Sequence, residues 1–159
     1  ILLVETPISS NSVYRQQFQM HRFITEFYPQ PVAVNDIGWV SYRNDNLILD
    51  LYGLGSIEAR DLWRSNSDFS YVPDFLRTND ITFAMVYSHW FDYELAESMI
   101  PVATLEIEVM AAGIDSPIVT WFAIDESTAD ELRPILETFS TTLPPNVTMT
   151  ILPPSTAGD

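Results

Sequence analysis

The sequence contains no cysteine, and this absence excludes three kinds of chemistry. A disulfide framework, a thiol nucleophile and a thiolate metal site all need that residue. Lysine is absent as well, so the seven cations are all arginine, against 22 acidic residues and a formal net charge of −15. Nucleic acids and anionic membrane surfaces bind cationic footprints. The composition therefore excludes a nucleic-acid partner and makes an anionic membrane a poor one.

Long hydrophobic runs and recognisable cofactor motifs are also missing. No apolar run approaches the roughly 20 residues that span a bilayer, and no signal peptide is visible. The two histidines, His21 and His89, have no metal-binding spacing, so we expect neither a metal nor another cofactor. Residues 53–55 (GLG) lack the third glycine and the Lys-Ser or Lys-Thr pair of a phosphate loop. They are typical of a tight turn.

What is present is material for a substantial core. Hydrophobic residues make up 47% of the 159 residues and aromatic residues 13%, which is far too much for a disordered segment. A chain of this length fits one domain, which we place at residues 1–152, with a tail at 153–159. The chain begins on apolar residues without Met, and we expect it to be part of a longer polypeptide.

Residues 1–30 contain the clearest helical pattern. Residues 1–4 are apolar and are followed by Glu-Thr-Pro, which predicts a short strand or an entering segment. Ser9, Ser10 and Asn11 are candidate N-caps for a helix that extends to about Tyr28, because apolar residues then recur every three or four positions.

Residues 31–55 (PVAVNDIGWVSYRNDNLILDLYGLG) predict a strand, a short helix and a second strand. The strands are residues 31–35 and 47–51, and the helix between them covers 37–43 with Asp36 as its N-cap. Two strands joined by a short crossover are expected to be neighbours in one sheet. Asp36 and Asp50 then lie at the same edge, where ligands bind in open α/β sheets.

The remaining elements are predicted from the same patterns. The expected helices are residues 57–63, 72–77, an amphipathic segment at 93–99, and 125–140, with Pro134 as a local objection. The expected strands are residues 81–87, which should be central and covered on both faces, an antiparallel pair at 104–109 and 118–124, and an edge strand at 147–152. The sequence therefore predicts an α/β layered sandwich with a mixed, partly parallel sheet of about five or six strands flanked by helices.

Asp36 and Asp50 are candidates for paired acid/base carboxylates, which need separations of about 5 to 10 Å. A structural role is the simpler interpretation: Asp36 caps a helix, while Asp50 accepts bonds from the turn at residues 53–56 or pairs with Arg43. His89 lies between Ser88 and Asp92, but residues adjacent in sequence rarely form a catalytic triad, and no Gly-x-Ser-x-Gly elbow is present. We expect His89 to be structural or to contact a ligand.

A candidate ligand edge therefore combines six residues, and we assign no catalytic residue. They are Asp36, Asp50, Tyr87 and His89, with Arg15 and Gln16 from the first long helix. Several aromatic residues are able to stack on sugar rings, although core packing is the simpler expectation. They are Trp39, Tyr42, Trp63, Trp90 and Trp121.

Four segments resemble a known family. They are residues 11–20 (NSVYRQQFQM), 31–38 (PVAVNDIG), 49–55 (LDLYGLG) and 118–125 (IVTWFAID). Together they resemble the C-terminal soluble region of bacterial polytopic glycosyltransferase-like membrane proteins of the GT-C, mannosyltransferase type. The resemblance implies a domain on the extracytoplasmic face of the membrane, with the membrane-embedded remainder of the polypeptide as its partner. It also implies a carbohydrate or lipid-linked sugar as ligand, and catalytic carboxylates in a membrane part that this sequence does not contain.

Three hypotheses for the function remain open. The first is a non-catalytic domain of such a protein that contacts an acceptor glycan or the catalytic part. The second is a small soluble hydrolase that uses Asp36 and Asp50, or His89; side chains far apart or engaged by backbone hydrogen bonds would count against it. The third is a structural or protein-interaction domain, for which a large apolar surface patch would be the sign.

Overall fold

A computed structural model describes residues 2–66, 69–91, 95, 98–108 and 114–154 of the chain. The helices are α1 (Leu2–Arg15), α2 (Gln17–Arg22), the π-helix η1 (Phe23–Phe27), α3 (Gly38–Ser41), α4 (Ile57–Asn66), α5 (Val72–Thr78), the 3-10 helix η2 (Ser88–Trp90) and α7 (Glu126–Ser140). The strands are β1 (Val32–Val34), β2 (Ile48–Asp50), β3 (Phe83–Val86), β4 (Ile100–Ile107), β5 (Ile118–Ala123) and β6 (Val147–Ile151).

The strands form one mixed sheet in the order β2-β1-β3-β5-β4-β6. Strands β2, β1 and β3 are parallel, whereas β5, β4 and β6 are each antiparallel to a neighbour. From β1 the chain passes to β2 on one side and then returns to β3 on the other. The order therefore reverses at β1, and the carboxyl ends of β1 and β3 form a topological switch point.

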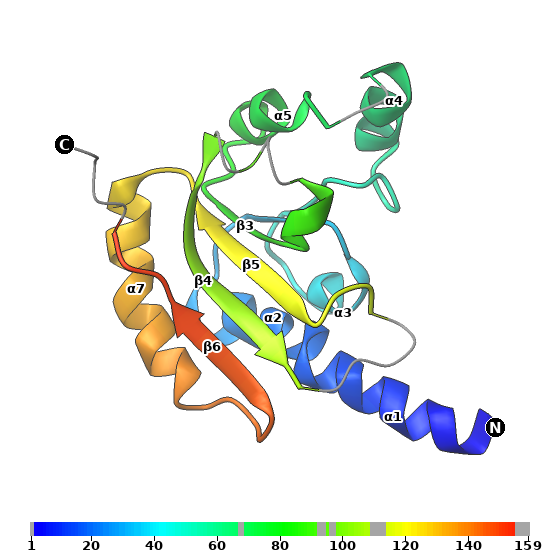
Figure 1. The fold of residues 1–159 in the computed structure, drawn as a ribbon. Helices are drawn as coiled ribbons and strands as arrows, with labels where there is room; N and C mark the ends of the chain where they lie inside the picture. The colour runs from blue at the N-terminus through cyan, green and yellow to red at the C-terminus, as the bar shows by residue number, and fades with distance from the viewer. Residues whose placement is uncertain (1, 67–68, 92–94, 96–97, 109–113, 155–159) are drawn as a thin grey trace.

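Helices cover both faces of this sheet, so the α/β layered fold expected from the sequence is confirmed (Figure 1). On one face α2, η1 and α7 pack through Met20, Phe23, Leu132 and Phe139. On the other face α4 and α5 pack through side chains that include Ala59, Val72, Phe75 and Leu76. Successive strand residues alternate between the two cores, as the period of a β-strand requires.

Strand β3 explains why its sequence is almost continuously apolar. Phe83 and Met85 enter one core, and Ala84 and Val86 enter the other. All four residues are buried, and β3 pairs with β1 on one side and β5 on the other. The prediction of a central strand is confirmed, as is the edge position of β6.

The N-terminal segment corrects one expectation. Residues 1–4 were expected to form a short strand or an entering segment, but α1 already begins at Leu2 and continues through Pro7 to Arg15. Ser9, Ser10 and Asn11 are consequently inside a helix and not at its cap. Pro7 removes one intrahelical hydrogen bond close to the helix end, where the cost is small because few turns depend on it. Figure 1 shows α1 extending away from the sheet.

Several other boundaries differ from expectation. The helix after β1 is short, Gly38–Ser41, and its N-cap position is occupied by Ile37 and not by Asp36. Strand β4 begins earlier than predicted, at Ile100, and its register shifts between Pro101 and Ala103. Pro134 lies inside α7, which nevertheless begins at Glu126 with Asp125 as a capping acceptor for Thr128 N. Most of the segment expected at 93–99 lies outside the described residues.

Of the five aromatic residues expected to pack in the core, only Trp121 is fully buried. Trp39, Tyr42 and Trp63 expose 41%, 51% and 38% of their surface, so core packing was the wrong expectation for these three.

Within the described residues, no helix is both long and apolar enough to cross a bilayer.

Candidate functional site

A cavity of about 400 Å³ opens at the carboxyl ends of the three parallel strands. Its walls come from the segments after β1, β2 and β3 and from the turn that enters β5. We call this cavity the edge site. Its lining residues are Asn35, Asp36, Tyr52, Leu54, Tyr87, Trp90, Ile114 and Asp115. This is the switch point, where open α/β sheets bind ligands.

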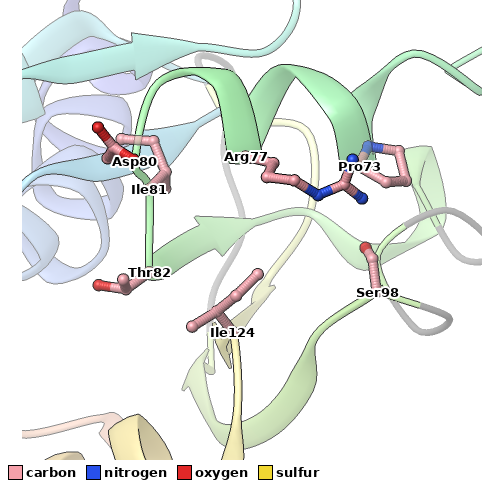
Figure 2. Close-up of a pocket in the computed structure, with 7 residues that line it drawn as sticks. All are labelled: Pro73, Arg77, Asp80, Ile81, Thr82, Ser98 and Ile124. Carbon is pink, nitrogen blue, oxygen red and sulfur yellow. The ribbon is translucent and has the colours of Figure 1, made fainter.

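A larger cavity of about 560 Å³ lies between α5, the entry to β3 and the end of β5 (Figure 2). Its chemical groups do not converge. Figure 2 shows the Asp80 carboxyl group directed away from the Arg77 guanidinium. Arg77 instead pairs with Asp74 at 2.5 Å, with both side chains exposed. The smaller edge site therefore has the better claim to function.

Asn35 contributes an unusual buried donor to the edge site. The residue is 2% exposed, and its Oδ1 accepts a 2.9 Å hydrogen bond from Tyr87 N, which links the ends of β1 and β3. Among the described residues, no acceptor lies within reach of its Nδ2. Leaving a buried donor unpaired costs about 1 to 3 kcal/mol, so native structures usually satisfy such groups. The Nδ2 atom is covered in this structure, so a ligand oxygen in the edge site would satisfy it after a small rotation of the amide.

Asp36, the next residue, is held by two donors. Gln17 Nε2 donates to its Oδ2, and the backbone of Gly38 donates to its Oδ1 over 3.3 Å. Burial raises the pKa of Asp36 above the ordinary value of 3.8, and the bonds from Gly38 and Gln17 oppose that rise without cancelling it. The Asp36 side chain is partly exposed and lines the edge site. It can accept hydrogen bonds there, although burial disfavours its charged form.

Tyr87 is joined to the start of the second helix. Its hydroxyl donates to Gln16 Oε1 at 2.8 Å, and Gln16 Nε2 donates to Ser116 O at 2.7 Å. Burial and the negative charge of Asp36 raise the pKa of Tyr87 to about 12. The phenol is therefore protonated at neutral pH, where it donates a hydrogen bond and does not act as a base.

His89 and Trp90 converge on one carboxylate. Asp115 Oδ2 lies 2.9 Å from His89 Nε2 and 2.7 Å from Trp90 Nε1. The ring of Trp90 also lies 4.7 Å, centroid to centroid, from the ring of Tyr52. Asp115 comes from the turn before β5, so this contact closes the edge site on the side away from β2.

Asp50 has a different role from Asp36, although Asp50 ends β2 and Asp36 follows its partner strand β1. Its side chain accepts four backbone hydrogen bonds, from Tyr52 N and Gly53 N at 3.0 Å each, Gly55 N at 2.6 Å and Ser56 N at 3.1 Å. The residue is only 4% exposed. This arrangement matches the structural interpretation of Asp50, with the turn and not Arg43 as its partner. It leaves no free lone pair for acid/base work with Asp36.

The six residues expected at a ligand edge are thus separated into three groups. Asp36 and Tyr87 line the edge site, with Gln16 behind Tyr87 and His89 bonded to Asp115 beside it. Asp50 organises the adjacent loop. Arg15 lies elsewhere, in a groove between α1 and the turn before β6, together with Pro7, Ile8, Asn11, Ser12 and Asn146.

Six lining residues of the edge site were not among the expected ligand-edge residues, although Trp90 was considered as a ring that stacks on sugars: Asn35, Tyr52, Leu54, Trp90, Ile114 and Asp115. The position of Asn35 directly after a buried strand was a usable signal, since β1 ends at the same edge as Asp36. No local pattern marks Asp115, because its partners are 25 and 26 residues away. Among the described residues, no group of three or more His, Cys, Asp or Glu side chains is placed to hold a metal ion.

Comparisons with known proteins place the chain in a family. Neither the curated proteins nor the solved structures that were searched gave a match. Residues 8–130 match the family described as "Domain of unknown function (DUF8728)", and this range contains the whole edge site. Because the match covers well over half of the 159 residues, the chain belongs to the DUF8728 family.

Proposed function

We propose that the domain recognises a neutral carbohydrate at the edge site and is a non-catalytic, extracytoplasmic part of a membrane glycosyltransferase-like protein. The observation that carries the ligand class is the buried, unpartnered Nδ2 of Asn35 beside carboxylate acceptors and aromatic rings. A sugar hydroxyl accepts one hydrogen bond while it donates another. It therefore satisfies Asn35 and a carboxylate together.

The charge of the edge site favours a neutral ligand. Asp36 and Asp115 line it, and none of its described lining residues is cationic. A phosphate or nucleotide would meet carboxylates in place of the arginine, lysine or helix N-terminus that usually binds it. The rings of Tyr52 and Trp90 offer apolar surface for the C–H face of a sugar, and a cavity of about 400 Å³ falls in the range of small-ligand sites.

The same geometry supports a binding role over a catalytic one. Asp50 is occupied by four backbone donors, and Tyr87, with a pKa of about 12, is a poor base at neutral pH. The proposed setting rests on the resemblance in residues 31–38 and 49–55, the two segments that build this edge. In that setting the partners are the membrane-embedded remainder of the polypeptide and a lipid-linked sugar or acceptor glycan.

The ligand class is tested by NMR titration with neutral di- and trisaccharides of mannose, glucose and galactose. We expect the Asn35 side-chain amide signals to move in a saturable way, with a dissociation constant in the millimolar range or tighter. Inorganic phosphate and UMP should leave these signals in place. If no saccharide moves the Asn35 amide signals, or phosphate alone does, the proposal fails.

Two variants and a control sharpen the test. Asn35→Asp keeps the acceptor for Tyr87 N but replaces the unpartnered donor with an oxygen, so we expect a loss of affinity of about tenfold or more. Asp115→Asn changes the charge at the rim, where Asp115 is half-exposed. Asp130→Asn makes the same chemical change on the exposed face of α7 and should leave affinity unaltered.

A hydrolase is a second candidate, favoured by one contact. The 2.9 Å approach of His89 Nε2 to Asp115 Oδ2 orients an imidazole beside the edge site, as in acid/base pairs. Asp36, with its raised pKa, would supply the second acidic group. Turnover of chromogenic glycosides or esters that is lost in His89→Ala would establish this candidate. Saccharide binding without turnover would leave the recognition role alone.

A further inference from the structure

Two hydrogen-bonding side chains of the edge site lie on different walls of the cavity. Asn35 follows β1 and Asp115 precedes β5, and β3 separates these two strands in the sheet. Because β5 is antiparallel to β3, its start lies at the same edge as the carboxyl ends of β1 and β3. A ligand in the cavity therefore has Asn35 on one side and Asp115 on the other.

One of these two side chains offers a donor and the other an acceptor. Asn35 Nδ2 has no acceptor among the described residues. Both contacts that the Asp115 carboxylate makes with ring nitrogens of η2 end on Oδ2, so within the described residues its Oδ1 is left for a ligand. Asp36 is less suited to this role, because each of its oxygens already accepts a hydrogen bond. The edge site thus presents a donor and an acceptor to opposite sides of a ligand.

Leu54 adds an apolar side chain to the wall of the edge site. It exposes 64% of its surface and comes from the loop that the Asp50 carboxylate holds. A hexose can stack its C–H face on aromatic rings, but the groups around its ring are hydroxyls, which gain nothing from an aliphatic neighbour. A methyl group that becomes buried against Leu54 would improve affinity by about fourfold.

We propose that the edge site selects sugars with an acetamido group, the N-acetylhexosamines. This inference rests on the proposed function, because it names the class of neutral carbohydrate bound at the same site. The acetamido carbonyl accepts from Asn35 Nδ2 after a small rotation of the Asn35 amide, its N–H donates to Asp115 Oδ1, and its methyl group packs on Leu54. In a trans amide the N–H and C=O groups point in opposite directions, which matches a donor and an acceptor on two walls.

Two other groups at the same ring position match the edge site less completely. A hydroxyl group both accepts and donates, but it has no methyl group for Leu54. A protonated amine is attracted by Asp36 and Asp115, but it has no acceptor and leaves Asn35 Nδ2 unpaired. A site that holds a buried polar group discriminates against ligands that leave this group unpaired. Of the three groups, only the acetamido group engages the donor, the acceptor and the apolar side chain together.

NMR titration with three matched methyl glycosides tests this selectivity. They are glucose, glucosamine and N-acetylglucosamine, compared at about pH 6, where the amine is protonated. The corresponding galactose and mannose series cover the other ring configurations. In at least one series we expect the N-acetyl sugar to bind about tenfold tighter than its parent hexose and its amine, and to move the Asn35 side-chain amide signals.

The contact with Leu54 is tested directly and by substitution. Nuclear Overhauser effects should connect the acetyl methyl group to the Leu54 methyl groups and not to those of Ile57, which lies on α4 outside the edge site. Leu54→Ser should reduce the preference for the N-acetyl sugar over the hexose about fourfold. Ile57→Ser is the matched control, at 69% exposure against 64%, and should leave the preference unchanged. Circular dichroism of both variants checks that the fold is intact.

The possible results separate this inference from the proposed function. Equal affinity for the N-acetyl sugar and the hexose in all three series would overturn the inference and leave neutral carbohydrate recognition standing. A preference that Leu54→Ser does not reduce would also overturn it. Tightest binding of the amine would assign the edge site to cations and contradict both proposals, as would the absence of binding by every sugar.

Discussion

Asp50 provides the most direct test of how the edge of the sheet is held together. Its carboxylate is almost completely buried and accepts hydrogen bonds from four backbone N–H groups of residues 52–56. These donors come from a loop that has no strand or helix partner of its own, so the side chain replaces the missing secondary structure. Asp50→Ala removes every one of these acceptors in a single step.

The expected loss follows from the four bonds and from their limits. A hydrogen bond to a charged group contributes about 1.5 to 3 kcal/mol, but four bonds to one group are not additive, and part of the loop can be rehydrated because Leu54 is exposed. We therefore expect a loss of about 3 to 5 kcal/mol, similar to breaking a buried ion pair. For a chain of this size that lowers Tm by about 10 °C or more.

Thermal unfolding followed by circular dichroism, together with urea titration, measures this loss. Asp74→Ala is the matched control: Asp74 is also a paired aspartate, but its side chain is 82% exposed, so we expect less than about 1 kcal/mol. Asp50→Asn keeps one oxygen but turns an amide toward the other two donors, and should be nearly as harmful as the alanine variant. A loss below about 1 kcal/mol for Asp50→Ala would refute the reasoning.

Three further predictions concern the same edge. Gly53→Ala should destabilise strongly, because φ is +88° and an added Cβ would lie 2.6 Å from the backbone of Arg60; an unchanged urea midpoint would contradict this. The raised pKa of Asp36 means that its contribution to stability is present below about pH 3.8 and is lost as pH rises through the folded-state pKa. The Tm of Asp36→Asn minus that of the parent should therefore increase from pH 3.5 to pH 7, and a constant difference would count against the shift. Burial and the charge of Asp50 raise the pKa of Tyr71 to about 12, so the parent should lose stability between pH 10 and pH 12. In urea titrations the free energy of unfolding of Tyr71→Phe should fall less steeply over this pH range. At neutral pH the variant should be less stable than the parent, because it lacks the 2.5 Å hydrogen bond to Leu51 O.

Local patterns predicted much of this edge because its strands are short and adjacent in sequence. The apolar runs of β1 and β2, the crossover between them and the glycines after Asp50 were enough to predict parallel neighbours and a carboxylate held by a turn. The register agrees, since Val34 is paired with Asp50. Here each feature depends on contacts of about 20 residues or fewer, and local propensity and tertiary structure agree.

Features that depend on distant partners could not be predicted in the same way. The orientation of the Asn35 amide depends on Tyr87, 52 residues away, whose backbone N–H donates to Oδ1. The start of α1 at Leu2 could not be predicted for a different reason. Four apolar residues followed by Glu-Thr-Pro are equally compatible with a strand. The prediction that Trp39 and Tyr42 pack in the core was wrong. Aromatic residues are usually buried, and the sequence alone does not show which of them are exposed.

Asp36 and Asp50 show how two equivalent carboxylates acquire different roles from the chain around them. After β2 the turn returns four N–H groups to Asp50, whereas after β1 only Gly38 returns one to Asp36. The Asp50 loop in turn places Tyr52 and Leu54 in the wall of the edge site. A buried carboxylate that never meets the ligand thus shapes the cavity in which its neighbour can act. Loss of Asp50 should consequently abolish saccharide binding through the position of Tyr52, even at temperatures where the domain remains folded.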